Sequence, residues 1–285
     1  MEEKLLRAQS KELNEILGKK FPVLDSGFIR CIDYLGNDDA IVQAARVSCG
    51  KGTKKALEDA ELIRYLMRHE HLTPFEMCVL KLHIRVPMDC WRQWVRHRTS
   101  SLSEQSSRYS IMDNGFQETD EKEWRYQSKN NKQGSGGFFD EENGKILSEK
   151  EKTFHKIAKE VYDERIEMGV AREQARKDMP LSSYTEAYWK MDLRNLFNFL
   201  KLRMHPHAQK EIREYATVIY EEIVKKWVPV AANAFEDYIL ETITFSNREI
   251  KILEAPDDDI LDYVKEFNWI PDDVFDNLEK YYYEG

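Results

Sequence analysis

The chain has 285 residues, of which 41% are hydrophobic, and a formal net charge of -9. This length and apolar content allow a substantial core, as one large domain or two small ones, and exclude a chain that is disordered throughout. The acidic balance argues against nonspecific binding to duplex nucleic acid, which needs a basic surface. No stretch approaches twenty uncharged apolar residues, so we expect no membrane span.

The N-terminal stretch MEEKLLRAQSKEL predicts a charged amphipathic helix and lacks the apolar core of a signal peptide. We therefore expect a soluble, cytoplasmic protein. No two of the four cysteines form a C-x-x-C pair, and without a secretory signal they are expected to be reduced core or surface thiols. These cysteines are Cys31, Cys49, Cys78 and Cys90.

The first elements are a strand and two helices. The pattern from Val23 to Leu35 predicts a short strand, and Asn37 offers an N-cap for a helix that ends at Ser48. A second helix is expected from Leu57 to Arg68, with its apolar residues on one face.

Two histidines, His69 and His71, follow this second helix. At this spacing they could ligate a metal from a strand. Nothing nearby completes a zinc set, so we expect no metal site.

A strand and a short helix come next. Leu80, Leu82, Ile84 and Val86 alternate with polar residues, which predicts a strand with one buried face, and Pro87 suits the first turn of a helix. In that helix an apolar side is expected to face inward, while another face is polar and mostly cationic. The inward residues are Trp91, Trp94 and Val95, and the polar ones are Gln93, Arg96 and His97.

The stretch from Ser100 to Ser110 holds six serines together with Glu104, Gln105, Arg108 and Tyr109, and shows no apolar period. We expect a polar loop. Hydroxyls, backbone N–H groups and guanidinium forks suit an anionic ligand such as phosphate. A solvated serine-rich turn is the simpler interpretation, but a buried strand and two tryptophans hold this cationic cluster in an acidic chain, which favours a binding site.

After Ile111 the composition becomes polar, and residues 113–150 predict a surface insertion. Its glycines at 134, 136 and 137 do not form a phosphate loop, because no Lys-Ser/Thr follows them and no strand precedes them. A helix is expected from Lys152 to Met168, with an apolar stripe in the core. This stripe comprises Phe154, Ile157, Ala158, Val161 and Tyr162.

Two further helices are expected in the C-terminal half. The first has a core stripe from Leu193 to Leu200, with Arg194, Asn198 and Lys201 on another face, and it ends before the residues His205-Pro206-His207. The second, from Ala208 to Lys226, places five residues on one face: Ile212, Tyr215, Ala216, Ile219 and Ile223. The acidic, aromatic tail from Glu254 to Gly285 is expected to be a C-terminal extension.

Several polar blocks together resemble the flavin-dependent thymidylate synthase family. The signature RHR-x-x-S-x-N-E-x-S-x-R-Y is matched by Arg96, His97, Arg98, Ser101, Glu104, Ser106, Arg108 and Tyr109, with Ser103 in the usual Asn position. The segment H-x-T-x-F-E near the flavin is matched by His71, Thr73, Phe75 and Glu76, followed by Met77 where the family often has another His.

Two later blocks extend the resemblance. Residues 175–180 resemble the family's A-R-x-x-L-P element, with Met179 in the Leu position. Residues 192–209 are similar to its second motif block, except that Asp192 replaces the usual Asn.

The resemblance implies an α+β fold, in which helices flank an antiparallel sheet and the C-terminal half is largely helical. It implies a family domain over residues 23–235, which contains the polar insertion at about 113–150. Residues 1–22 would be an N-terminal helical extension, and residues 236–285 an acidic C-terminal extension.

The implied reaction is the reductive methylation of dUMP to dTMP. Methylenetetrahydrofolate would supply the carbon, and FAD with NADPH would supply the hydride. Many enzymes activate the uracil ring by adding a cysteine thiolate, but neither main motif block contains a cysteine. The resemblance instead makes Arg203 the catalytic residue, opposing negative charge on the ring. It also implies a homotetramer with active sites shared between subunits.

The resemblance assigns the remaining site residues to two ligands. The dUMP contacts would be Gln93, Trp94, Val95, Arg96, Glu104, Gln105, Ser106, Ser107, Arg108, Arg176 and Arg203. The FAD contacts would be Ser48, His71, Thr73, Arg96, His97, Arg98, Glu104, Asp192, Arg194 and Asn198.

Two other classes of function fit parts of the sequence. A noncatalytic nucleotide- or RNA-binding protein could use the cationic loop with its aromatic neighbours. A metal-dependent nucleotide hydrolase could use the many carboxylates, but these are scattered rather than set at helical ligand spacing. Neither class explains both motif blocks.

Overall fold

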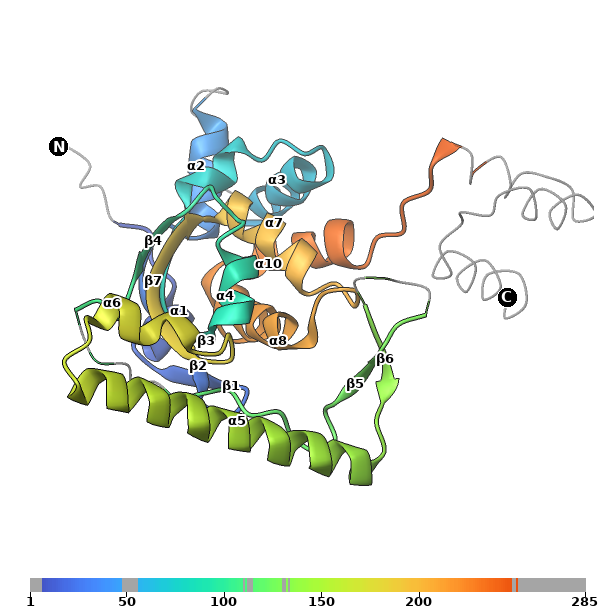
Figure 1. Cartoon of the computed structure of the whole chain (residues 1–285). Coiled ribbons are helices and arrows are strands. Elements are labelled where there is room, and N and C mark those ends of the chain that lie inside the picture. Colours follow the sequence, from blue (N-terminus) through green and yellow to red (C-terminus); the bar gives the residue numbers. More distant parts are fainter. Residues whose placement is uncertain are drawn as a thin grey trace, which may run out of the picture. The chain divides into compact units, whose positions relative to one another are not determined.

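The computed structural model describes residues 7–47, 56–109, 111, 115–129, 132, 134–247 and 250. The chain divides into two compact units, residues 1–240 and residues 241–285. The sheet and the helices that form the site belong to the first unit (Figure 1).

A five-stranded antiparallel sheet organises the first unit, which confirms the α+β fold with an antiparallel sheet flanked by helices. In spatial order its strands are β1 (Lys20–Val23), β2 (Gly27–Leu35), β3 (Val79–Pro87), β7 (Tyr184–Asp192) and β4 (Ser101–Glu104). β3 pairs with β7 along its whole length, from Val79 opposite Asp192 to Pro87 opposite Tyr184. Because Leu80, Leu82 and Ile84 alternate with polar residues, one face of β3 is buried, as predicted.

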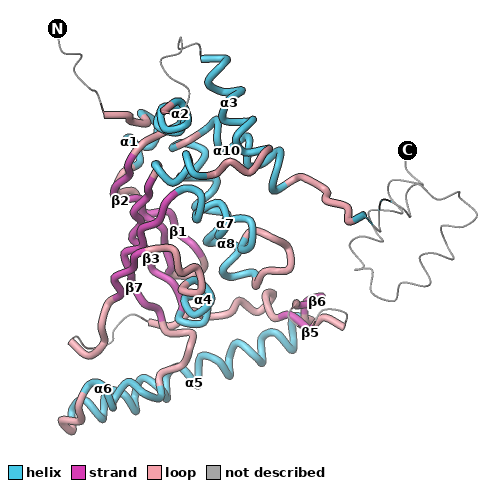
Figure 2. Tube along the Cα trace, turned by 90° about the horizontal axis from the view of Figure 1, so that it is seen from above, coloured by secondary structure: helices cyan, strands magenta, loops and turns pink. Residues whose placement is uncertain are grey.

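Helices cover this apolar face (Figure 2). They include α4 (Met88–Trp94), α7 (Leu193–Arg203), α8 (Lys210–Val218) and α10 (Pro229–Phe235). Trp94 is fully buried, and its ring centroid lies 5.2 Å from that of Trp189 on β7 and 4.9 Å from that of Phe199 on α7. Each such aromatic pair contributes about 1 kcal/mol beyond burial. These contacts fix the end of α4, from which the Arg96-His97-Arg98 segment continues.

The N-terminal elements differ from the sequence prediction in two places. Within the described residues, the predicted N-terminal helix is α1 (Lys11–Ile16), which begins after Ser10 because Ser10 caps it by accepting a hydrogen bond from the N–H of Leu13; residues 1–6 lie outside the described residues. The strand predicted from Val23 is a hairpin, since the turn residues after Val23 separate β1 from β2.

The predicted helices of residues 37–68 are confirmed. Asn37 caps α2 (Asp38–Arg46) by accepting from the N–H of Asp39 at 3.1 Å. Next come α3 (Ala56–Arg68) and the short 3-10 helix η1 (Thr73–Met77). Ser48, the predicted end of the first of these helices, lies outside the described residues.

The prediction of an irregular loop after α4 is wrong for Ser101–Glu104, which forms the edge strand β4. All four of its residues are exposed. An edge strand with both faces in solvent has no apolar period, so its pairing with β7 could not be read from hydropathy.

The insertion contains regular structure where it is described. Strands β5 (Arg125–Gln127) and β6 (Ser135–Phe138) form a hairpin, and α5 (Glu141–Glu167) runs from it toward α6 (Arg172–Ala175) (Figure 1). The helix begins at Glu141 instead of Lys152 because Asp140 caps it, accepting from the N–H of Asn143 at 2.9 Å.

The predicted core stripe of this helix is wrong at Phe154 and Ile157, which are 56% and 52% exposed, and confirmed at Tyr162, which is buried. The helix also buries small and polar side chains, such as Ser148, whose hydroxyl donates to the carbonyl of Thr119 at 2.7 Å. Apolar spacing therefore identified the helix but only part of its buried face.

The C-terminal helices follow the sequence prediction closely. The stripe predicted for 208–226 is buried throughout, although the helix begins at Lys210 as α8 and continues through the π-helix η3 (Ile219–Val224) and α9 (Lys225–Trp227). Two more short helices are the 3-10 helix η2 (Arg176–Asp178) and the π-helix η4 (Glu236–Leu240). The tail from 254 to 285 lies outside the described residues.

Cys31, Cys78 and Cys90 are free and buried, as expected for reduced core thiols, while Cys49 lies outside the described residues. Across the described residues we find no helix with both the length and the apolar character needed to cross a membrane.

Candidate active site

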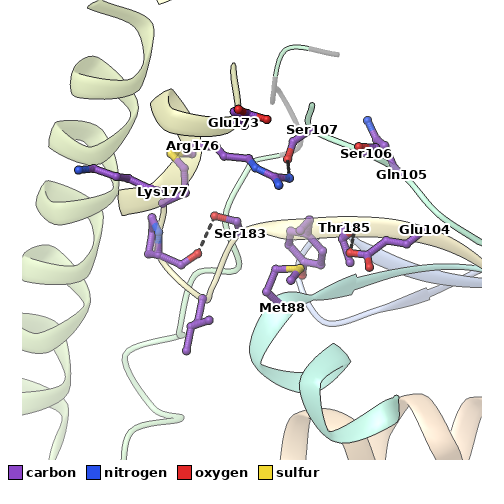
Figure 3. Close-up of a pocket in the computed structure, with 14 residues that line it drawn as sticks. Met88, Glu104, Gln105, Ser106, Ser107, Glu173, Arg176, Lys177, Ser183 and Thr185 are labelled. Atoms are coloured by element: carbon purple, nitrogen blue, oxygen red, sulfur yellow. Dashed lines mark hydrogen bonds between the residues drawn. The ribbon is translucent and has the colours of Figure 1, made fainter. Parts of the chain in front are cut away.

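Two cavities hold most of the predicted site residues. The larger, of about 670 Å³, is lined by Glu104, Gln105, Ser106, Ser107 and Arg176 among others (Figure 3). The smaller, of about 220 Å³, is lined by Arg96, His97, Arg98, Asn198 and Arg203 among others. No residue lines both cavities. Of the predicted dUMP contacts, five line the larger cavity, and Arg96 and Arg203 line the smaller one. The four that line neither are Gln93, Trp94, Val95 and Arg108.

Strand pairing positions one wall of the larger cavity. The N–H of Gln105 donates to the carbonyl of Glu186 at 2.8 Å, which continues the pairing of β4 with β7 by one residue. The buried hydroxyl of Thr185 donates to Oε1 of Glu104 at 2.9 Å. Figure 3 shows these two side chains turned toward each other at the edge of the sheet. The carboxylate of Glu104 is thus held in one orientation at the cavity.

The opposite wall is built by α6 and η2, which hold the loop after β4. Arg176 donates to Oγ of Ser107 (Figure 3), and Arg172 Nη1 donates to the carbonyl of Tyr109 at 2.7 Å. Between these two bonds, Arg108 forms an ion pair with Glu173 at 3.1 Å. This wall therefore gathers guanidinium groups and hydroxyls, which are the donors that phosphate oxygens accept from.

The smaller cavity is formed where α4 ends beside α7. Arg203 Nε donates to Nε2 of His97 at 3.1 Å, and Arg203 Nη2 donates to the backbone carbonyl of Gln93 at 3.3 Å. Because a guanidinium N–H can only donate, Nε2 of His97 is the acceptor and the ring carries its proton on Nδ1. Burial, and then the charge of Arg203, lower the pKa of His97 to about 4. His97 is therefore neutral at pH 7.

Arg203 itself is half-buried, and burial lowers its pKa. A guanidinium still remains protonated at neutral pH. Of its five N–H donors, one bonds His97 and another bonds Gln93, so the rest of the fork is available to an anionic group at the cavity.

The other predicted flavin contacts lie on η1 and α7. Arg194 and Asn198 are exposed on α7, one helical turn apart. Glu76 on η1 pairs with Arg194 at 2.5 Å, and the rings of Phe75 and Phe197 join the two elements with centroids 6.2 Å apart. His71 and Thr73 are exposed at the start of the same short segment, although they line neither cavity.

Asp192 is the N-cap of α7. Its Oδ1 accepts from the N–H of Asn195 at 2.9 Å, and the side-chain amide of Asn195 donates to both carboxylate oxygens. Asp and Asn are equally good N-caps. The carboxylate of Asp192 therefore caps α7 as well as the Asn that the family usually has at this position.

Trp94 and Val95 are less exposed than the neighbouring Arg96 and Arg98. The side chain of Trp94 is fully buried in the core, so only its backbone is left for a ligand contact. Val95 is half-buried, and Ser48 lies outside the described residues.

Several cavity residues were not predicted from the sequence, among them Glu173, Thr185 and Asn195. Glu173 lies three positions before Arg176, a spacing that places two helical residues on one face, so this one could have been found. Thr185 could not, because its partner Glu104 is 81 positions away in the chain.

A search of the described residues finds no group of three or more His, Cys, Asp or Glu side chains that could hold a metal ion.

Residues 30–230 match the family model described as thymidylate synthase complementing protein, which places the chain in that class. A flavin-dependent thymidylate synthase from Wolbachia pipientis wMel is 50% identical over 253 residues, which cover 89% of each protein. One from Thermus thermophilus is 53% identical over 235 residues, covering 82% of this chain and 84% of that protein. The chain belongs to the flavin-dependent thymidylate synthase family, as its motifs predicted.

Solved structures agree with this assignment. The UMP/dUMP methylase PolB from Streptomyces cacaoi, bound with 5-Br dUMP, has a TM-score of 0.69 and 29% sequence identity. The alignment covers 77% of this chain and 98% of PolB. The same protein bound with 5-Br UMP gives a TM-score of 0.68.

Proposed function

We propose that this protein converts dUMP to dTMP by reductive methylation. Methylenetetrahydrofolate is the carbon donor, and FAD with NADPH is the source of the hydride. The observation that carries the proposal is Arg203, held by His97 and Gln93 at a cavity of a chain that belongs to this family. The folate and NADPH assignments rest on family membership, and the nucleotide is also supported by the brominated uridine nucleotides bound to PolB.

The larger cavity suits the phosphate end of dUMP. Arg176 and the hydroxyls of Ser106 and Ser107 lie together there, and Arg108 is held next to them by Glu173. Guanidinium groups bind phosphate through two parallel hydrogen bonds, so these residues fix both position and orientation.

Arg203 suits the uracil ring. Methylation at C5 requires electron density at that carbon, and negative charge then develops on the N3/O4 side of the ring. A fixed cation opposes this charge in the transition state more strongly than in the ground state, which lowers the barrier. Two hydrogen bonds hold Arg203 before the substrate binds, so little reorganisation is needed.

The residues predicted to bind flavin fit a cofactor with a pyrophosphate and a polar ring system. Arg96, Arg98 and Arg194 are exposed and offer paired N–H donors to phosphate oxygens, and Asn198 offers an amide to ring atoms. FAD, when bound, supplies the hydride chemistry that no side chain provides. His97, neutral at pH 7, orients Arg203 through the hydrogen bond that its Nε2 accepts.

The described cysteines are unsuited to activating the ring. Burial raises the pKa of Cys31 and of Cys78 to about 12, and raises that of Cys90 further. A buried thiol that stays protonated at neutral pH is a poor nucleophile. This favours the electrostatic role of Arg203 over addition of a cysteine.

The division of the dUMP contacts between two cavities supports a shared active site. We infer a homotetramer in which the larger cavity of one subunit meets the smaller cavity of a partner, so that phosphate and ring contacts come from different chains. Closed symmetric assemblies of this kind bury self-complementary surfaces. We also infer a cytoplasmic location, which the free cysteines support.

The function is tested with the purified protein and its proposed substrates. We expect a yellow protein with the absorbance of oxidised flavin, and dTMP formed from dUMP only when methylenetetrahydrofolate and NADPH are both present. His97→Ala and Arg194→Ala should lower the ratio of flavin to protein. Lys201→Ala is the matched control, since Lys201 is exposed on the same helix but lines neither cavity. A colourless protein that binds nucleotide or RNA without turnover would support the noncatalytic alternative.

A further inference from the structure

Three polar side chains form a hydrogen-bonded relay between α4 and the start of α8. Gln93 Nε2 donates to Oε1 of Gln209 at 2.5 Å, and Gln209 Nε2 donates to Oδ2 of Asp89 at 2.9 Å. All three residues are half-buried. None of the three side chains lines the smaller cavity, but the relay is linked to it through the backbone carbonyl of Gln93, which accepts from Arg203 at 3.3 Å.

The carboxylate at one end gives the relay a direction. An ionised carboxylate only accepts hydrogen bonds, whereas a side-chain amide both donates and accepts. Asp89 therefore takes the NH₂ of Gln209, and this turns the oxygen of Gln209 toward Gln93. Gln93 must then present its own NH₂ to Gln209. Among the contacts of the described residues, Oε1 of Gln93 remains available as an acceptor.

A fixed amide distinguishes two pyrimidines that have nearly the same shape. At N3 and C4, uracil presents an N–H donor and a carbonyl acceptor, whereas cytosine presents a ring-nitrogen acceptor and an amino donor. An amide that binds one of these edges must turn over to bind the other. Turning Gln93 over would bring its oxygen against the oxygen of Gln209 and leave half-buried polar groups unpaired.

We propose that Asp89 is a positioning residue that acts through Gln209 to fix the amide of Gln93, and that this relay makes the site select a uracil over a cytosine nucleotide. The inference rests on the proposed function, since the predicted contact of Gln93 with dUMP brings the base to the amide. A site built to pair with one edge rejects the analogue that leaves its polar groups unpaired.

The test measures binding of dUMP and of dCMP to the flavin-loaded protein by calorimetry, without turnover. We expect the wild-type protein to bind dUMP at least about tenfold more tightly than dCMP, as for the loss of one hydrogen bond. Asp89→Asn keeps the size of the side chain but can donate as well as accept, so the residue at position 89 no longer fixes the direction of the relay, and Glu211 is the only carboxylate left to accept from the side chain of Gln209 among the described contacts. The ratio of the two dissociation constants should fall about three- to tenfold. Asp33→Asn, which removes an exposed carboxylate from β2, is the matched control and should keep the ratio.

Gln209→Met gives an independent test, because it keeps the length of the side chain and removes the relay. We expect the same fall in the ratio, and melting temperatures identify which variants are folded. An unchanged ratio in a folded Asp89→Asn or Gln209→Met protein would overturn the inference while leaving the proposed function intact. A wild-type protein that binds dUMP and dCMP equally would also overturn it. Failure of the wild-type protein to bind dUMP would instead contradict the proposed function itself.

Discussion

Replacing Arg203 by alanine should lower kcat far more than it raises KM for dUMP. The guanidinium is already bonded to His97 at 3.1 Å and to the carbonyl of Gln93 at 3.3 Å. It is therefore fixed in place before the ring acquires charge. An interaction that strengthens only as charge develops contributes to kcat, while one that is equally strong in the ground state contributes to KM.

The expected magnitude follows from the loss of one preorganised donor. Removing such a donor costs about 3 to 4 kcal/mol, which is a loss of about 10²- to 10³-fold in kcat. The assay is steady-state release of tritium from dUMP labelled at C5, with dUMP varied at saturating folate and NADPH. The substitution also leaves Nε2 of His97 without the donor that Arg203 supplies, so Arg203→Lys should recover only part of the rate.

Lys201→Ala is the control for loss of a cation from the last turn of α7. Lys201 is exposed and lines neither cavity, so its loss should change kcat by less than about twofold, as for ordinary surface substitutions. A rise in KM for dUMP with unchanged kcat in Arg203→Ala would refute the catalytic role and leave Arg203 as a ground-state binding residue.

Three further predictions concern Ser106, the assembly and Asp38. Ser106→Ala should raise KM for dUMP and keep measurable turnover in the same assay, because Ser106 and Arg176 line the cavity of the proposed phosphate site. An inactive variant that still binds dUMP and flavin normally would instead indicate that Ser106 is a nucleophile. Light scattering should give about four times the monomer mass. Mixing Arg176→Ala with Arg203→Ala protein should restore activity, because the two residues line different cavities; mixtures that never recover would count against shared sites. Asp38 accepts from the N–H groups of Val230 and Ala231, and burial raises its pKa from 3.8 to about 6, so its contribution to stability is present below pH 3.8 and lost as pH rises through 6. Urea unfolding at fixed protein concentration should show that the wild-type protein loses on the order of 2 kcal/mol more than Asp38→Asn between about pH 4 and pH 6; parallel pH profiles would contradict the assignment.

Much of the fold could be predicted because local signals and burial agree. The alternation in β3 and the stripe of α8 each describe an element with one face in the core, so hydropathy reports both the element and its orientation. The cap of α2 was equally readable, since Asn37 and the helix it caps are neighbours in the chain. Where an element leaves apolar residues exposed, as in β4 and at Phe154 and Ile157 of α5, the same reasoning failed.

Many of the residues predicted for the site line the two cavities, but their division between two cavities could not be predicted from the sequence. The Arg96-His97-Arg98 motif and Arg203 come together because α4 and α7 pack through Trp94 and Phe199. The loop after β4 is instead held beside α6 and η2, because Arg176 donates a hydrogen bond to Ser107 in this loop. The positions of the α4 end and of the loop after β4 depend on the order of the strands in the sheet. This order cannot be predicted from the local sequence.

The division of the chain at residue 240 also separates its charge. Residues 241–285 hold 13 acidic and 4 basic side chains, which gives a net charge of -9, the same as that of the whole chain. Residues 1–240, which carry the sheet and both cavities, hold 39 of each sign and are formally neutral. Proteins near zero net charge associate more readily, because no mutual repulsion keeps them apart. The acidic segment therefore supplies the whole net negative charge that makes copies of the chain repel one another, while the unit that carries the cavity arginines has no excess negative charge of its own.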